Sequence, residues 1–140
     1  ATSLLRGAWH YWPALVFRTG SLERYPFRDG LPIIQDLALL IDMTAAGESL
    51  VLDPTVCFSY RRHTQSASAS SLLRGNRFSD ERRYYASAAE QMQQRGWDRA
   101  ARTARRRWTS RLHAVTLLPT ALKQRDRSAV RSLVDHALER

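Results

Sequence analysis

The sequence has little cysteine and almost no lysine. Its single thiol, Cys57, excludes an internal disulfide and fits a protein of a reducing compartment. No apolar run approaches the roughly 18 residues that cross a bilayer, and the first residues lack the basic-then-apolar order of a secretory signal. Only Lys123 among the 22 basic residues is a lysine. The single thiol and the lack of a membrane span or signal predict a cytoplasmic chain that attaches, at most, peripherally to the inner face of the membrane.

Charge is distributed unevenly along the 140 residues. Residues 1–73 hold 6 basic and 6 acidic side chains, whereas residues 74–140 hold 16 basic and 7 acidic ones and so carry the whole net charge of +9. Arginine presents a planar fork that suits phosphate groups. A basic half of this kind indicates either a partner such as nucleic acid, an anionic membrane or a phosphorylated substrate, or simply a solvated helical face.

Residues 35–46 repeat apolar side chains at helical spacing, with Asp36 in the first turn and Gly47 just after the end. Both positions favour a helix, which we predict here. Residues 50–52 and 56–60 are rich in strand-forming residues on either side of Asp53-Pro54, which predicts a short pair of strands. The run from 64 to 71 is rich in Ser, Ala and Thr and predicts a linker, so we place a domain boundary between residues 71 and 72.

Three amphipathic helices are predicted over the remaining residues, 72–140. Ser79 is expected to cap the first, which ends at Gly96. Asp98 is expected to cap the second, which Pro119 breaks or kinks, and Asp126 is expected to cap the third. Together they predict a small basic bundle, or an arm that lies against a neighbour.

The order of short motifs over residues 5–70 resembles the acceptor-side, C-terminal half of the catalytic domain of family-2 glycosyltransferases. Trp-Pro-Ala-x-x-Phe-Arg at 12–18 leads to Phe-Arg-Asp-Gly at 27–30, then to Gln-Asp-Leu at 35–37, and Tyr-Arg-Arg-His-Thr-Gln-Ser at 60–66 closes the stretch. The resemblance implies a GT-A fold. The expected class is therefore mainly α with α+β character: an incomplete α/β part with a strand pair over 1–71, followed by the helical extension. The donor-side sheet and Asp-x-Asp motif of that fold are not in this sequence.

The resemblance also implies roles for individual residues. Asp36 corresponds to the catalytic base of the family, which takes a proton from the acceptor hydroxyl, and Gln35 stands where the family usually has glutamate. His63 corresponds to a histidine that reaches the metal or the diphosphate of the nucleotide sugar. Arg61 and Arg62 would lie near the same phosphates.

The acceptor loop is predicted to include Trp12, Gly30 and Gln35. Aromatic faces stack on sugar rings, and a glycine lets the backbone approach a ligand closely. The resemblance implies a divalent cation, Mg²⁺ or Mn²⁺, in the intact enzyme. A lone imidazole at His63 binds such hard ions poorly without carboxylates. We therefore expect this chain to carry no cation and to transfer no sugar by itself.

These inferences predict part of an inverting enzyme that moves a sugar from a nucleotide sugar to a cell-envelope or polysaccharide acceptor, either a glycan or a lipid-linked one. The arginine-rich helices would hold it near an anionic membrane surface or a lipid-diphosphate acceptor. Unpaired strand edges and an exposed apolar face would also favour a homo-oligomer.

Two alternatives come from other classes of protein. One is a nucleic-acid-binding module that uses residues 98–127, which is disfavoured because the basic residues encircle the helix instead of forming one stripe. The other is an oligomerisation module formed by residues 79–140. His10, His113 and His136 have no partners at metal-ligand spacing and are predicted to bind no metal.

Overall fold

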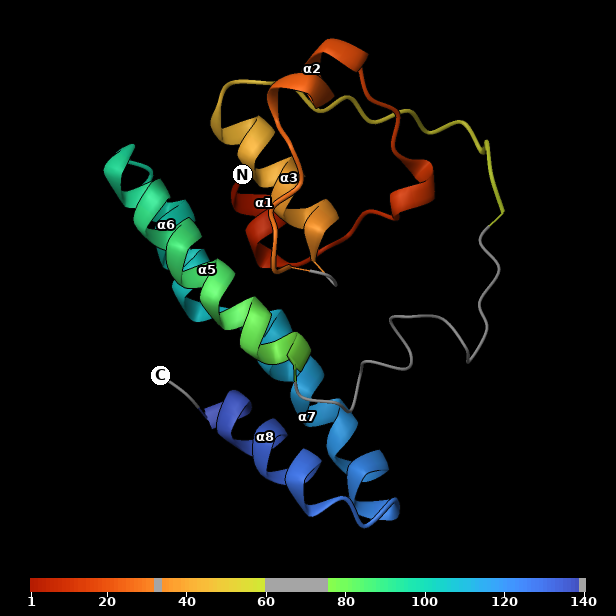
Figure 1. Cartoon of the computed structure of the whole chain (residues 1–140), viewed down its shortest axis with the longest axis vertical. Helices are drawn as coiled ribbons and strands as arrows, with labels where there is room; N and C mark the ends of the chain where they lie inside the picture. Colours follow the sequence, from red (N-terminus) through yellow and green to blue (C-terminus); the bar gives the residue numbers. More distant parts are fainter. Residues whose placement is uncertain (32–33, 60–75, 139–140) are drawn as a thin grey trace.

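The computed structural model describes residues 1–31, 34–59 and 76–138. Helices account for all the regular secondary structure in these ranges (Figure 1). The elements are α1 (Thr2–Arg6), the 3₁₀ turn η1 (Trp12–Ala14), α2 (Thr19–Arg24), α3 (Gln35–Ala45), α5 (Asn76–Gln94), α6 (Asp98–Arg106), α7 (Trp108–Lys123) and α8 (Arg127–Leu138).

The predicted strand pair is wrong, and with it the GT-A α/β fold. Within the described part of the chain, residues 50–59 form no strand. Asp53 accepts a hydrogen bond from the backbone N–H of Thr55 (2.9 Å), which closes a local turn. The side chains on either side stay in solvent, with Val51 85% and Val56 94% exposed. A strand needs a neighbour to satisfy its backbone groups, and no described segment pairs with this one.

The prediction of a helix that ends before Gly47 is confirmed. Helix α3 runs over Gln35–Ala45, and the backbone N–H of Glu48 bonds back to the carbonyl of Met43 (3.0 Å). Gly47 has a φ of 98°, a left-handed conformation that glycine adopts without steric cost. Seven of the 11 residues of α3 are buried, so this helix is a central element of the molecule.

The first apolar core joins α3 to α1, α5 and α6. Leu4 and Leu5 of α1 are buried together with Leu37 and Ile41 of α3. From α5 and α6 the core receives Tyr84, Tyr85, Ala88, Ala89, Met92, Ala100, Ala101 and Ala104. The predicted boundary between residues 71 and 72 lies outside the described residues.

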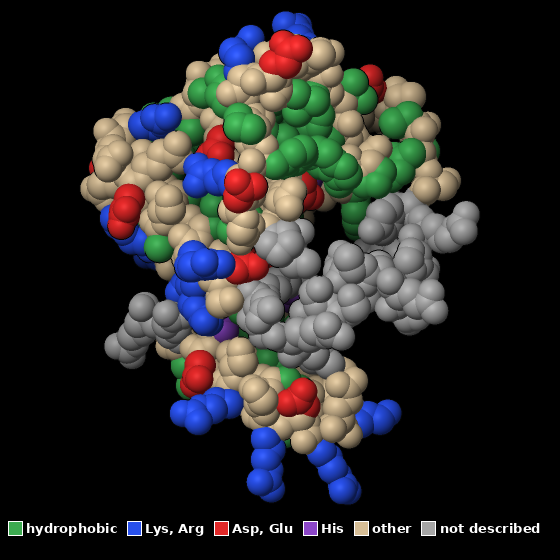
Figure 2. Space-filling view, in the orientation of Figure 1, with side chains coloured by type: hydrophobic (Ala, Val, Ile, Leu, Met, Phe, Trp, Pro, Cys, Tyr) green, Lys and Arg blue, Asp and Glu red, His purple; other side chains and the backbone are tan. Residues whose placement is uncertain are grey.

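The second core lies in a hairpin formed by α7 and α8. These helices run antiparallel at the far end of the molecule from α2 and α3 (Figure 1). Phe78 of α5 packs into the hairpin against Ala114, Ala121, Ala129 and Leu133. Basic side chains project from the free end of the hairpin (Figure 2).

The structure describes four helices over residues 76–138, where the sequence predicted three. The predicted second helix divides at Arg107, whose φ of 45° is left-handed, and α7 then continues through Pro119 without a break. Helical spacing would place Trp108, Leu112 and Val115 on the face that continues Ala101 and Ala104 of α6, but all three side chains are exposed in α7. A left-handed residue ends the helical repeat, so the face that points inward changes.

The predicted helix ends are partly correct. Asp126 caps α8 by accepting the N–H of Ala129 (2.9 Å), and Gly96 ends α5 with a φ of 72°, both as predicted. Ser79 is not a cap, because α5 already begins at Asn76. Asp98 is the first residue of α6, and the capping position belongs to Trp97.

Among the helices that the structure describes, none has the length and apolar character that a membrane span requires.

Candidate functional site

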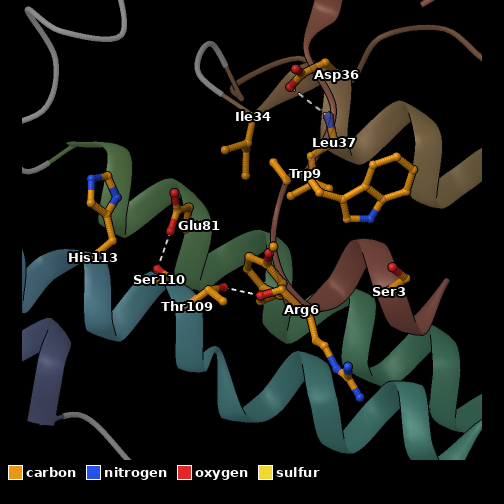
Figure 3. Close-up of a pocket in the computed structure, with 13 residues that line it drawn as sticks. Ser3, Arg6, Trp9, Ile34, Asp36, Leu37, Glu81, Thr109, Ser110 and His113 are labelled. Carbon is orange, nitrogen blue, oxygen red and sulfur yellow. Dashed lines mark hydrogen bonds between the residues drawn. The ribbon is translucent and has the colours of Figure 1, made fainter. Parts of the chain in front are cut away.

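A large pocket lies where the end of α1 meets the start of α3 and the facing sides of α5 and α7 (Figure 3). It has a volume of about 570 Å³. Its walls are Ser3, Arg6, Gly7, Ala8, Trp9, Ile34, Asp36, Leu37, Glu81, Tyr85, Thr109, Ser110 and His113. We call it the Asp36 pocket.

Asp36 occupies the first turn of α3, at the wall of this pocket. One carboxylate oxygen accepts the backbone N–H of Leu37 (2.8 Å), and the other lies 3.3 Å from Nε2 of His10. Burial disfavours the charged carboxylate, but the His10 contact and the Leu37 N–H outweigh it, so the pKa of Asp36 is lowered. Asp36 is therefore ionised at neutral pH while 29% of its side chain remains exposed.

His10 is the partner that the sequence did not reveal. Its side chain is only 3% exposed, and Trp9 meets its ring edge-on at a centroid distance of 6.1 Å. The Nε2–Asp36 contact is close enough for an ion pair but is not aligned as a hydrogen bond, and Nδ1 has no hydrogen-bond partner among the described residues. His10 therefore acts on the Asp36 carboxylate through the short distance between them, without an aligned hydrogen bond. No metal-ligand spacing links positions 10 and 36, so sequence reasoning missed the pair.

A second polar group begins at the wall of the pocket, where Ser110 of α7 contacts both Glu81 of α5 and His136 of α8. The Ser110 hydroxyl donates to Glu81, and Oγ is 2.8 Å from Nε2 of His136. Nδ1 of His136 lies 3.3 Å from Nη1 of Arg82. Ser110, Glu81 and His136 are all buried, so this group is shielded from solvent.

The direction of these hydrogen bonds argues against a nucleophilic serine. A guanidinium can only donate, so Nδ1 of His136 accepts from Arg82 and the proton of the neutral ring is on Nε2. Nε2 then donates to Ser110, and Ser110 donates to Glu81. A catalytic serine instead gives its proton to the histidine. We conclude that this chain of bonds joins three helices and does not activate Ser110.

The structure separates the predicted acceptor-loop residues from the Asp36 pocket. Trp12 packs against Phe17 and Phe27, at ring-centroid distances of 5.6 and 5.5 Å, in an aromatic group of its own. Gly30 has a φ of 76° with open space around it, and Gln35 begins α3 without lining the pocket. Trp9, which sequence reasoning did not select, lines the pocket together with Asp36, and in Figure 3 its indole lies on the far side of Leu37 from the Asp36 carboxylate.

The predicted phosphate and metal ligands, Arg61, Arg62 and His63, lie outside the described residues. In the ranges that are described, no three His, Cys, Asp or Glu side chains come together as a metal site. Asp36 and His10 alone are too few ligands for Mg²⁺ or Mn²⁺, which require several oxygen donors.

No protein-family model matches the chain, and comparisons with curated proteins and with solved structures find no match.

Proposed function

We propose that this chain supplies the acceptor-side carboxylate of a sugar-transfer site, with Asp36 as the general base. The observation that carries the proposal is that Asp36, the residue assigned this role by the order of motifs, is ionised and half-buried at the wall of a pocket of about 570 Å³. At the operating pH, a general base must be unprotonated, and it must lie within hydrogen-bond reach of the substrate group whose proton it takes. Asp36 meets the first of these requirements and is accessible from the pocket.

The chemistry assigned to Asp36 is a single proton transfer. As the acceptor hydroxyl oxygen forms its bond to the anomeric carbon of the donor sugar, its proton moves to the Asp36 carboxylate. The bond from that carbon to the diphosphate breaks, and the nucleoside diphosphate leaves with the electron pair from the opposite face. This course inverts the configuration at the anomeric carbon.

The surroundings of Asp36 are compatible with a hydroxyl-bearing ligand. A carboxylate has about four acceptor positions, and the Leu37 N–H uses one of them, while His10 lies close to the other oxygen without an aligned hydrogen bond. Trp9 is 44% exposed and brings an aromatic side chain to the wall of the same pocket. His10 has a positioning role in this proposal, because it holds the carboxylate in place and favours its charged form.

Acceptor binding by the chain itself is the first test. Titration with a panel of methyl glycosides, followed by NMR, is expected to shift the amide signals of Asp36 and Leu37 and the indole N–H of Trp9. Asp36→Asn removes a charged acceptor and should weaken binding by about tenfold. Glu23→Gln, an exposed carboxylate on α2, is the matched control and should bind as the parent does. Equal binding by the Asp36→Asn variant and the parent chain would overturn the role of Asp36.

Transfer is tested in a polypeptide that joins these residues to a nucleotide-sugar-binding half. There Asp36→Asn should lower kcat by about 10²- to 10⁴-fold and leave KM for the donor nearly unchanged, as expected for loss of a general base. The divalent cation belongs to that intact enzyme, in which it would assist departure of the diphosphate. Retention of full kcat in the Asp36→Asn variant would refute the proposal.

A further inference from the structure

Four arginines converge on a second pocket, on the other side of α1 from Asp36. It has a volume of about 420 Å³ and lies between the end of α1, helix α6 and the start of α7. Arg6, Arg99, Arg102 and Arg106 line it together with Trp108. We call it the arginine pocket.

The fold accounts for this convergence. Arg99, Arg102 and Arg106 are three and four residues apart, so they share one face of α6, while three alanines bury the opposite face. Arg6 reaches them because the hydroxyl of Thr109 donates to its backbone carbonyl and ties the end of α1 to α7. Figure 3 shows the Arg6 side chain pointing away from the Asp36 pocket toward α6.

Gly7 makes this approach possible. A Cβ at position 7 would lie 3.1 Å from Oγ1 of Thr109, which is closer than a comfortable contact. The two threonines of the pocket, Thr103 and Thr109, use their hydroxyl protons on backbone carbonyls of Arg99 and Arg6. The guanidinium groups are therefore the charged donors that the pocket offers to a ligand.

The charge in the arginine pocket is not balanced by the described residues. Elsewhere Arg24 pairs with Glu48, Arg28 with Asp42 and Arg83 with Asp80. In the described part of the chain, no carboxylate pairs with Arg6, Arg99, Arg102 or Arg106, and all four are exposed. Like charges held together raise the local potential, and an anion that binds among them relieves their repulsion.

We propose that the arginine pocket binds a phosphate or diphosphate group of a small ligand. Guanidinium forks make paired hydrogen bonds to phosphate oxygens, and several of them can divide a diphosphate between them. The volume suits a small molecule, whose pockets begin at about 300 Å³. Trp108, which is 59% exposed and has the guanidinium carbon of Arg111 5.6 Å from its ring centroid, adds an aromatic side chain to the wall beside the charges.

A pocket-sized ligand fits these observations better than a polymer does. A nucleic acid requires basic residues that follow the backbone over an extended surface. Here the four arginines line a single pocket where α1, α6 and α7 meet. The proposal does not rest on the role of Asp36, because Asp36 does not line the arginine pocket, although Arg6 borders both pockets.

The test uses inorganic pyrophosphate as the probe and calorimetry on the whole chain at roughly physiological salt. Saturable one-site binding is expected. The double variant Arg102→Gln with Arg106→Gln should bind at least about tenfold more weakly, since each lost fork removes charge-assisted hydrogen bonds. The matched control, Arg127→Gln with Arg131→Gln, removes the same amount of charge from α8. These two arginines line a separate hollow together with Asp135, so the control should change binding by less than about twofold.

Two further measurements separate specific binding from general attraction. Arg102→Lys keeps the charge but loses the fork, so it should bind with intermediate affinity. Circular dichroism melting checks that each variant folds. Absence of saturable binding, or equal losses in the arginine-pocket and control variants, would overturn the proposal.

The source of the phosphate is identified by competition. Pyrophosphate that displaces the chain from vesicles containing lipid-linked diphosphate would assign the site to a lipid headgroup, and displacement by a nucleotide would assign it to a nucleotide. The chain could instead bind an oligonucleotide that pyrophosphate does not displace, with both double variants weakening this binding equally. That result would overturn the pocket proposal in favour of a nucleic-acid-binding surface. Asp36→Asn should leave pyrophosphate binding unchanged, which keeps this result distinguishable from the test of sugar transfer.

Discussion

Asp36 shows how one contact sets the charge state of a side chain. Its pKa lies below the usual value of about 3.9 because the His10 contact and the Leu37 N–H favour the carboxylate more than burial disfavours it. A folded-state pKa below that of the unfolded chain stabilises the fold at pH values above the unfolded pKa. That contribution is lost as the pH falls through the folded pKa.

His10→Phe is expected to raise the pKa of Asp36. Phenylalanine keeps the site buried but has no ring nitrogen to favour the charge, so burial then acts with less opposition. NMR titration of the side-chain carboxyl carbons measures this directly. Asp53, whose pKa is lowered by the backbone N–H of Thr55, serves as an internal reference and should not change. An unchanged Asp36 titration would show that the His10 contact is not coupled to the carboxylate.

The Arg28–Asp42 ion pair is a second case in which a side chain's surroundings depend on a residue that is not its neighbour in the sequence. Asp42 receives two hydrogen bonds of 2.7 Å from the Arg28 guanidinium, which also lies 5.4 Å from the ring of Tyr84. Burial is the main cause that raises the pKa of Tyr84, and the Asp42 charge adds to it. These three residues connect α3, α5 and the loop before α3, and none of their pairings follows a local sequence pattern.

At the scale of the helices, one line of hydrogen bonds connects α5, α7 and α8. It passes from Arg82 through His136 and Ser110 to Glu81. The ring of His136 is fully buried and packs on Phe78 at a centroid distance of 4.5 Å. A buried polar group that loses its partner costs more than the bond itself was worth. The line therefore fixes how the α7–α8 hairpin sits on α5.

Ser110→Ala should lower the free energy of unfolding by about 1–3 kcal/mol, because Glu81 and His136 each lose a buried partner. Urea denaturation followed by circular dichroism measures the change. Ser87→Ala, on an exposed face of α5, is the matched control and should change stability by less than about 0.5 kcal/mol. Similar small effects for both variants would mean that the line contributes little to docking of the hairpin.

For the whole molecule, the distribution of apolar surface is the main feature. Large side chains of the N-terminal part remain in solvent, among them Val16, Val51, Leu52 and Val56. Figure 2 shows hydrophobic side chains gathered on this part of the surface, away from the α7–α8 hairpin. Contiguous apolar patches on a protein surface usually mark a place where another surface binds.

We expect the chain to self-associate through this surface. Light scattering over a range of concentrations should give a mass that rises above that of one chain. The double variant Val51→Ser with Val56→Ser should shift the mass toward that of a monomer, because it removes apolar area that association would bury. Leu112→Ser, at an exposed position of α7, is the control and should have no such effect. A parent chain that is monodisperse and monomeric would contradict the expectation.

The sequence by itself determined the features that depend on near neighbours. Gly47 and Gly96 end helices because a left-handed residue there requires no distant partner, and Asp126 caps α8 through a group three residues away. The inward face of α5, with Phe78, Tyr85 and Met92, is also a matter of local spacing. The separation of charge between the two halves follows from composition alone.

Only the tertiary structure decided the features that depend on a partner far along the chain. Residues 50–59 have the composition of strands, but a strand forms only where another segment accepts its hydrogen bonds, and none of the described segments does so. His10 meets Asp36 across 26 residues, Ser110 meets His136 across the same separation, and Arg6 reaches α6 through a contact with Thr109, 103 residues away. Spacing along the sequence does not predict these contacts, because it is the packing of the two cores that brings the residues together.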